Sequence, residues 1–130
     1  MGPVVDTSVL IDYFAGVKNR ETSAFDDLLD EGVAPATVPV IVQEFLQGFT
    51  SASDLARARS YLVPFDRLEA PTYQIHELAA ELHTDGRRSG ETVPTVDTLI
   101  VTMARESGRA LLTRDRHQKV LAKIAGVPLA

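Results

Sequence analysis

The stretch Val4-Val5-Asp6-Thr7-Ser8-Val9-Leu10-Ile11 joins a short apolar run, an acid and the start of a second apolar run. Val4-Val5 is predicted to form a buried strand, because a brief apolar run is typical of strands covered on both faces. Ser8 is a favourable N-cap, so a helix is expected to continue through Phe14 and to end at Gly16. A strand that leads directly into a helix is typical of an α/β fold.

Short strands and helices alternate along the rest of the chain. Further strands are expected at 34–38 and 110–113, a short extended segment at 62–65 and a final strand at 127–129. The expected helices lie around Glu21–Asp30, from Pro39 through Phe49, after a cap at Ser51 or Ser53, from Pro71 to the polar loop 85–90, around Val96–Ala104, and around Val120–Ile124. The pattern predicts a short central parallel sheet with helices on both faces.

Size and composition narrow the class of protein. With 130 residues, 45% of them hydrophobic, the chain is long enough for one domain, expected to span 1–130. The absence of cysteine excludes disulfides, thiolate metal sites and cysteine nucleophiles. No apolar run approaches the roughly 18 residues of a membrane span, and no signal-peptide pattern begins the chain. We therefore expect a soluble, cytoplasmic protein without a membrane partner.

Four acids are embedded in apolar sequence and are the candidate catalytic and metal-binding residues: Asp6, Glu44, Asp97 and Asp115. Burying a carboxylate is costly unless a cation or hydrogen-bond donors compensate it. Asp6 and Asp115 follow predicted strands, and ligands bind at the carboxyl ends of parallel strands. Oxygen ligands without cysteine favour Mg²⁺ or Mn²⁺, which serve phosphodiester hydrolysis. The net charge of −5 argues against a nucleic-acid partner unless divalent ions offset it.

A plainer interpretation exists for three of these acids. Asp6, Asp97 and Asp115 each stand where a helix is expected to begin, and aspartate is common there as a cap. Glu44 has no such explanation, since it is expected mid-helix at the border of the apolar stripe. The joint pattern favours a metal site, while the capping role of each aspartate stays open.

At these residues the chain resembles the PIN-domain ribonucleases, specifically the VapC toxins of bacterial toxin–antitoxin pairs. The resemblance rests on the opening stretch, on Glu44, on Asp97-Thr98-Leu99-Ile100 and on Leu111-Leu112-Thr113-Arg114-Asp115. It implies a PIN-like fold and an Mg²⁺- or Mn²⁺-dependent endoribonuclease that cleaves RNA, with tRNA or rRNA as the expected substrate. It also implies a homodimer and a VapB-like antitoxin as partners.

The resemblance assigns roles to three further residues. Ser8 matches a hydroxyl residue that supports the first acid, and Thr113 matches a threonine before the last acid. His117 stands where many relatives carry another aspartate. Because Mg²⁺ prefers oxygen to nitrogen, we expect His117 to weaken a second metal position, unless it merely faces solvent.

Two alternatives to a nuclease stay open at the level of the sequence. A receiver-like signalling domain also has an acidic Mg²⁺ pocket, although Asp6 lacks the adjacent acid that such a domain needs. A PIN-like module that only binds partners is the other alternative, and the intact acids argue against it. Apolar residues in surplus on the expected first and third helices are candidates for antitoxin binding: Tyr13, Phe14, Phe45, Leu46 and Phe49.

Overall fold

The computed structural model describes residues 1–130 and places four short strands among seven helices. The strands are β1 (Val4–Val5), β2 (Ala36–Thr37), β3 (Asp66–Arg67) and β4 (Leu111–Leu112), and all neighbouring pairs are parallel in the order β3-β2-β1-β4. The helices are α1 (Thr7–Phe14), α2 (Arg20–Asp30), α3 (Pro39–Leu46), α4 (Ala52–Tyr61), α5 (Tyr73–Arg88), α6 (Thr95–Glu106) and α7 (Arg116–Ala125). The expected α/β class with a short parallel sheet is confirmed.

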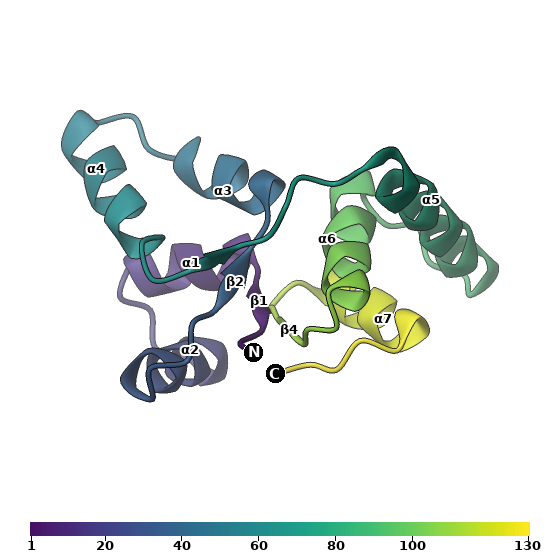
Figure 1. Cartoon of the computed structure of the whole chain (residues 1–130), viewed down its shortest axis with the longest axis horizontal. Coiled ribbons are helices and arrows are strands. Elements are labelled where there is room, and N and C mark those ends of the chain that lie inside the picture. The colour runs from purple at the N-terminus through teal and green to yellow at the C-terminus, as the bar shows by residue number, and fades with distance from the viewer.

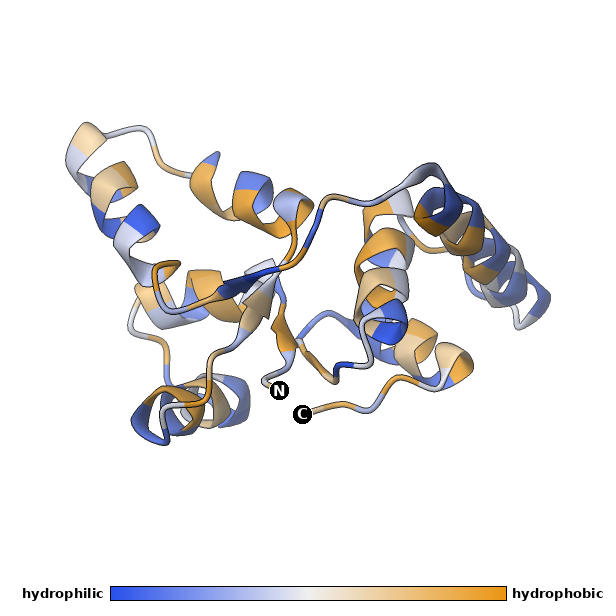
Figure 2. Cartoon of the chain, in the orientation of Figure 1, coloured by the Kyte–Doolittle hydropathy of each residue, from blue (hydrophilic) through white to orange (hydrophobic).

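Helices cover both faces of this sheet. Figure 1 shows α1 to α4 gathered on one side of the strands and α5 to α7 on the other. Within the second group all three helices contact one another, and within the first group α1 contacts α2 and α3. Hydrophobic residues lie on β1 and along α3, next to the sheet (Figure 2). No helix is both long enough and apolar enough to cross a bilayer.

The sheet fixes the direction in which its central strands end. Val4 and Val5 are fully buried, and they pair in register with Leu111 and Leu112. The backbone continues this pairing for one more residue, since the Asp6 N–H donates to the Leu112 carbonyl at 2.9 Å. The residues that follow β1 and β4 therefore leave the sheet at the same edge, which is where two of the candidate acids stand.

The opposite edge is held by a buried cation and a close backbone approach. The Arg109 guanidinium donates to the Gly2 carbonyl at 2.8 Å and to the Asp66 carboxylate at 3.4 Å, so it links the segment before β1 to the exposed edge strand β3. A β-carbon on Gly2 would lie only 2.1 Å from the Ala34 carbonyl oxygen. Glycine is therefore required where the chain enters β1.

The segment 62–65 is not extended as the sequence predicts. Residues 62–65 form a turn, and the strand follows at Asp66–Arg67. Leu62 and Phe65 are buried, so their apolar character anchors the turn in the core. Pro64, which has no N–H for a sheet hydrogen bond, also disfavours a strand at that point. At the C-terminus, the expected strand contributes only an isolated bridge between Leu129 and Leu111.

Two helix ends also differ from expectation. The predicted polar loop at 85–90 is mostly helical, because α5 continues through Gly86 to Arg88. Gly86 is buried, and a β-carbon there would lie 3.5 Å from the Leu121 side chain, so glycine allows α5 to approach α7 closely. Conversely, α3 ends at Leu46 and does not reach Phe49. The predicted cap at Ser51 is present and accepts from the Asp54 N–H at 3.1 Å.

Candidate metal centre

The four candidate acids come from four different segments of the chain and converge where β1 and β4 end. Asp6 links β1 to α1, Asp115 precedes α7, Asp97 lies in the first turn of α6, and Glu44 lies within α3. Asp6 and Asp97 are 4% and 9% exposed, so both carboxylates are nearly buried. The fold therefore assembles the cluster from segments that are distant in the sequence.

Two of the aspartates are also helix caps. The Asp6 carboxylate accepts the Ser8 N–H at 3.1 Å, and the Asp115 carboxylate accepts the Gln118 N–H at 2.9 Å. The capping interpretation is thus right for these two residues, and it does not remove them from the cluster. Asp97 is not a cap: the N-cap of α6 is Pro94, which has no side-chain donor or acceptor.

Ser8 is not the N-cap that the sequence suggests. It is the second residue of α1, and its Oγ accepts the Arg114 N–H at 3.1 Å. This bond attaches α1 to the segment that follows β4. Thr113 makes a similar link, because its Oγ1 donates to Asp6 Oδ2 at 3.4 Å and accepts the Asp115 N–H at 3.0 Å. The two hydroxyl residues thereby hold the first and fourth acids in a fixed relation.

Glu44 is joined to the cluster through Thr7. The Thr7 hydroxyl donates to Glu44 Oε1 at 3.1 Å. Burial raises the pKa of Glu44, and the charges of Asp6, Asp97 and Asp115 raise it further, while the Thr7 hydrogen bond lowers it. Glu44 lies at the edge of the apolar face of α3, as the sequence predicts. Ile41 and Phe45 on that face are buried.

Asp97 experiences the same repulsion. Burial raises its pKa most, and the charges of Asp115 and Asp6 raise it further. A hydrogen bond from Gln118 and the nearby His117 act in the opposite direction. His117 Nδ1 lies 4.0 Å from Asp97 Oδ2 and 3.9 Å from Asp115 Oδ1, so its ring borders the acids and does not simply face solvent.

Gln118 is the member of this site that the sequence analysis missed. Its side-chain nitrogen donates to Asp6 Oδ1 at 2.8 Å and to Asp97 Oδ1 at 3.0 Å. A signal was present, since Gln118 shares the buried face of α7 with Leu121 and Ala122, where an apolar residue is expected. It also stands three residues after the Asp115 cap, which is the glutamine position of a capping box.

The chemistry of these side chains fits a divalent cation. Oxygen or nitrogen atoms of Asp97, Asp115 and His117 lie within 4.8 Å of one another, close enough to share one ion. The raised pKa values of Asp97 and Glu44 show that the acids repel each other and are poorly hydrated, and a cation would relieve both effects. A site dominated by carboxylates suits Mg²⁺ or Mn²⁺.

Burial and repulsion together predict the stability of an Asp97→Asn variant in a metal chelator. A carboxyl group whose pKa is raised by folding destabilises the protein as the pH rises from its ordinary pKa through the folded value. At pH 7 the variant should therefore exceed the wild type in free energy of unfolding. Near pH 4 the difference should shrink, as measured by urea denaturation.

The matched control for this measurement is Asp85→Asn, since Asp85 is an exposed acid on α5. It should have the stability of the wild type at both pH values. An Asp97→Asn protein less stable than the wild type at pH 7 in chelator would contradict the view that burial and neighbouring charges destabilise the ionised Asp97 carboxylate.

Comparison with known proteins identifies the family. The PIN domain family model matches residues 4–124. Among solved structures, VapBC2 from Rickettsia felis bound to a DNA fragment from their promoter is similar over 100% of this chain and 98% of that chain, with a TM-score of 0.78 and 16% identity. A toxin-antitoxin complex from Klebsiella pneumoniae covers 88% of this chain and 87% of its own, with a TM-score of 0.69 and 23% identity.

FitAcB from Neisseria gonorrhoeae is also similar, with a TM-score of 0.69 and 16% identity over 97% of this chain and 94% of that chain. Identities this low show a common fold, whereas the family match spans nearly the entire sequence. The match leaves no support for a receiver-like signalling domain. The chain belongs to the PIN-domain family.

Proposed function

We propose that this single-domain chain is a divalent-metal-dependent endoribonuclease and the toxin of a VapBC-type toxin–antitoxin pair. The observation that carries the proposal is the convergence of Asp6, Glu44, Asp97 and Asp115 at one edge of the sheet. Membership of the PIN family supports nuclease chemistry, and the toxin–antitoxin complexes among its structural neighbours support the toxin role. A cytoplasmic location and a homodimer belong to the same proposal.

In this proposal the four carboxylates hold Mg²⁺ or Mn²⁺. When bound, the cation activates water and stabilises negative charge on the scissile phosphate. The surrounding residues have a different task, which is to keep the carboxylates in position. Thr113 connects Asp6 with Asp115, and Thr7 connects α1 with Glu44.

Two arginines beside the acids offer contacts for an RNA backbone. Arg114 and Arg116 flank Asp115, and both are exposed. Arg114 is paired with Asp12, and Arg116 lies 3.8 Å from Glu91. Surface ion pairs contribute little free energy, so RNA phosphates would readily replace these partners. The two arginines thus offer phosphate contacts despite the net charge of −5, and tRNA or rRNA is the expected substrate.

Cleavage of RNA is expected to require Mg²⁺ or Mn²⁺ and to cease in excess chelator. Asp97→Asn should fold normally and lose at least about 100-fold in cleavage rate, because the side chain keeps its shape but loses a charged metal ligand. Gel analysis of RNA fragments measures this rate, with Asp85→Asn as the control of unchanged activity. A folded Asp97→Asn protein with full activity would refute the metal site. A wild-type protein that cleaves no RNA but still binds partners would favour a PIN-like binding module.

The proposed effect of His117 is tested separately. A neutral imidazole beside Asp97 and Asp115 gives Mg²⁺ a less favoured ligand than a carboxylate. His117→Asp should therefore bind Mg²⁺ about tenfold more tightly, as measured by isothermal titration calorimetry. His76→Asp provides the control, since His76 is exposed on α5. An unchanged Mg²⁺ affinity in His117→Asp would show that His117 is a bystander.

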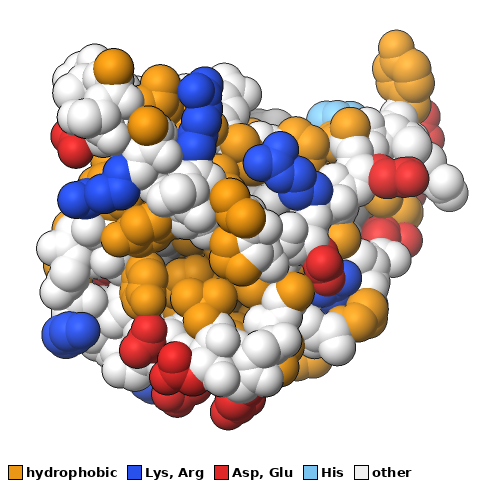
Figure 3. Space-filling model, turned by 60° about the vertical axis from the view of Figure 1, so that its left-hand side comes forward, with side chains coloured by type: hydrophobic (Ala, Val, Ile, Leu, Met, Phe, Trp, Pro, Cys, Tyr) orange, Lys and Arg blue, Asp and Glu red, His pale blue; other side chains and the backbone are white.

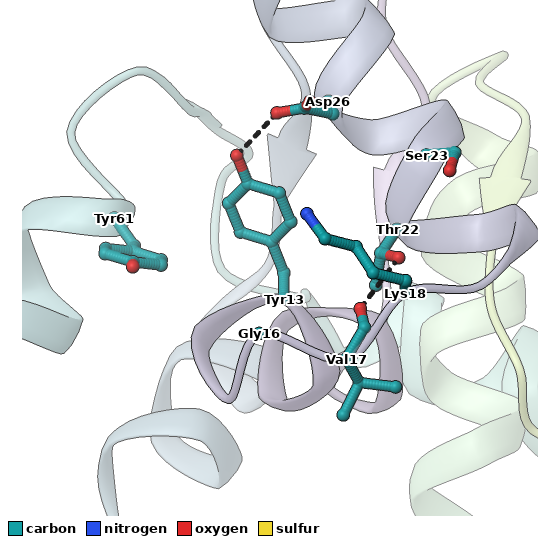
Figure 4. Close-up of a pocket in the computed structure, with 8 residues that line it drawn as sticks. All are labelled: Tyr13, Gly16, Val17, Lys18, Thr22, Ser23, Asp26 and Tyr61. Carbon is teal, nitrogen blue, oxygen red and sulfur yellow. Dashed lines mark hydrogen bonds between the residues drawn. The ribbon is translucent and has the colours of Figure 1, made fainter.

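A groove between α2 and α4 is the proposed antitoxin site. One part is an apolar cavity of about 310 Å³ lined by Tyr13, Phe25, Leu29, Ser60, Tyr61 and Pro64. Tyr13 and Tyr61 also line the adjoining polar cavity of about 270 Å³, in which the Tyr13 hydroxyl donates to Asp26 at 2.7 Å (Figure 4). Figure 3 shows this side of the molecule hollowed, with hydrophobic atoms inside and acidic side chains along the lower rim.

This groove overlaps only in part with the apolar residues that the sequence suggests. Phe45 is 1% exposed and belongs to the core, so its expected availability to a partner is wrong. Phe14, Leu46 and Phe49 are partly buried, and the Phe14 ring is covered by the Arg57 guanidinium at 3.9 Å from its centroid. Tyr13 is also partly buried, and it lines both cavities.

An antitoxin segment with apolar side chains should bury Tyr61 in this groove. Tyr61→Ala is expected to weaken the complex by about 2 kcal/mol, or roughly 30-fold in Kd, as is typical of a central interface tyrosine. The small protein that co-purifies with the tagged chain from its native cells is the partner to be used, and surface plasmon resonance gives the Kd. Tyr73→Ala is the matched control, because Tyr73 is 91% exposed on α5.

Equal Kd values for Tyr61→Ala and Tyr73→Ala would place the antitoxin elsewhere on the chain. If no small partner co-purifies, and expression of the chain alone does not slow growth, the toxin role fails. The nuclease role would then be judged on RNA cleavage alone.

A further inference from the structure

Gln118 is a buried polar residue with an unusual set of partners. It is 2% exposed, and its single side-chain nitrogen donates to carboxylates on two other segments, Asp6 after β1 and Asp97 in α6. Its side-chain oxygen is buried and has no hydrogen-bond partner. A buried polar atom without a partner destabilises the fold, so the two bonds made by the nitrogen must hold the amide in this orientation.

The type of residue matters as much as its position. An amide donates two N–H groups without carrying a charge, so it satisfies two carboxylates and adds no ion to the site. A lysine or arginine at this point would neutralise the acids permanently and would repel a cation. An apolar residue of the same size would leave both carboxylates without this donor.

We propose that Gln118 is a positioning residue that holds Asp6 and Asp97 together for the cation. The inference rests on the proposed function of the acid cluster as a divalent-metal site. Gln118 is also bonded to the Asp115 cap of α7, since its backbone N–H donates to that carboxylate at 2.9 Å. Three of the four acids are therefore tied to this one residue, two through its side chain and one through its backbone.

Two substitutions separate positioning from simple packing. Gln118→Met keeps the volume and removes both donors, so packing alone predicts no change. Positioning predicts a melting temperature at least about 5 °C below that of the wild type in chelator, from the loss of two hydrogen bonds to charged groups. It also predicts Mn²⁺ binding about tenfold weaker by calorimetry without RNA, as is typical when a residue that orients metal ligands is removed.

Gln118→Glu gives the opposite result for the metal. A fifth carboxylate repels the others, so the melting temperature in chelator should fall at least as far as in the methionine variant. Added negative charge should make the rise in melting temperature on adding Mn²⁺ larger than in the wild type. This comparison decides the matter even if Gln118→Met does not fold.

Gln74 on α5 is exposed and supplies the controls Gln74→Met and Gln74→Glu, both expected to behave as the wild type. Wild-type melting temperature and Mn²⁺ affinity in Gln118→Met, or a Gln118→Glu protein that gains no more from Mn²⁺ than the wild type, would overturn the positioning role. If the wild type binds Mn²⁺ and cleaves RNA, and the Gln118 variants have the same melting temperature and Mn²⁺ affinity, only the positioning role is refuted. If the wild type binds no Mn²⁺, the proposed function itself is refuted.

Discussion

The cost of burying carboxylates close to one another is the constraint on which the rest of this structure depends. Burial and mutual charge raise the pKa of Asp97 and of Glu44. Hydrogen-bond donors limit the cost: Thr7 for Glu44, Thr113 for Asp6, and Gln118 for Asp6 and Asp97. Each donor lies on a different segment from the acid it serves. The network therefore cross-links α1, α3, α6 and α7 while it stabilises the acids.

The sheet determines where this network forms. Each strand is only two residues long, yet the pairing of Val4 with Leu111 and of Val5 with Leu112 brings Asp6 and Thr113 to the same edge. Side chains alternate between the two faces of a strand, so a slip of one residue would turn Asp6 away from its partners. Full burial of Val4 and Val5 opposes such a slip. A very small sheet thus has a strict register, and the acid cluster depends on it.

The sequence predicted those features that have a local chemical signature. The apolar pairs of β1 and β4 identified the central strands, and acids within apolar runs identified Asp6, Glu44, Asp97 and Asp115. The edge strand β3 escaped prediction because Asp66 and Arg67 are exposed and carry no strand pattern. The continuation of α5 through Gly86 was not predicted for another reason. Glycine usually ends a helix, and only the contact with Leu121 explains a glycine inside this one.

The partners of each acid are the least predictable part of the site. Gln118 is ordinary in its own helix, and its importance arises only when β1 and α6 bring Asp6 and Asp97 to it. His117 likewise borders two acids because α6 and α7 pack side by side. Such contacts depend on the tertiary arrangement, and periodicity and propensity describe only the local chain.

The pairing of β1 with β4 has a consequence for the order in which the protein is synthesised and folds. Asp6 is synthesised well before Leu112, Thr113 and Gln118, which hold it. Until β4 has been synthesised, β1 has no pairing partner on this side. Contacts so distant in sequence also form slowly. The acid cluster therefore cannot be assembled before β4 and α7 have been synthesised.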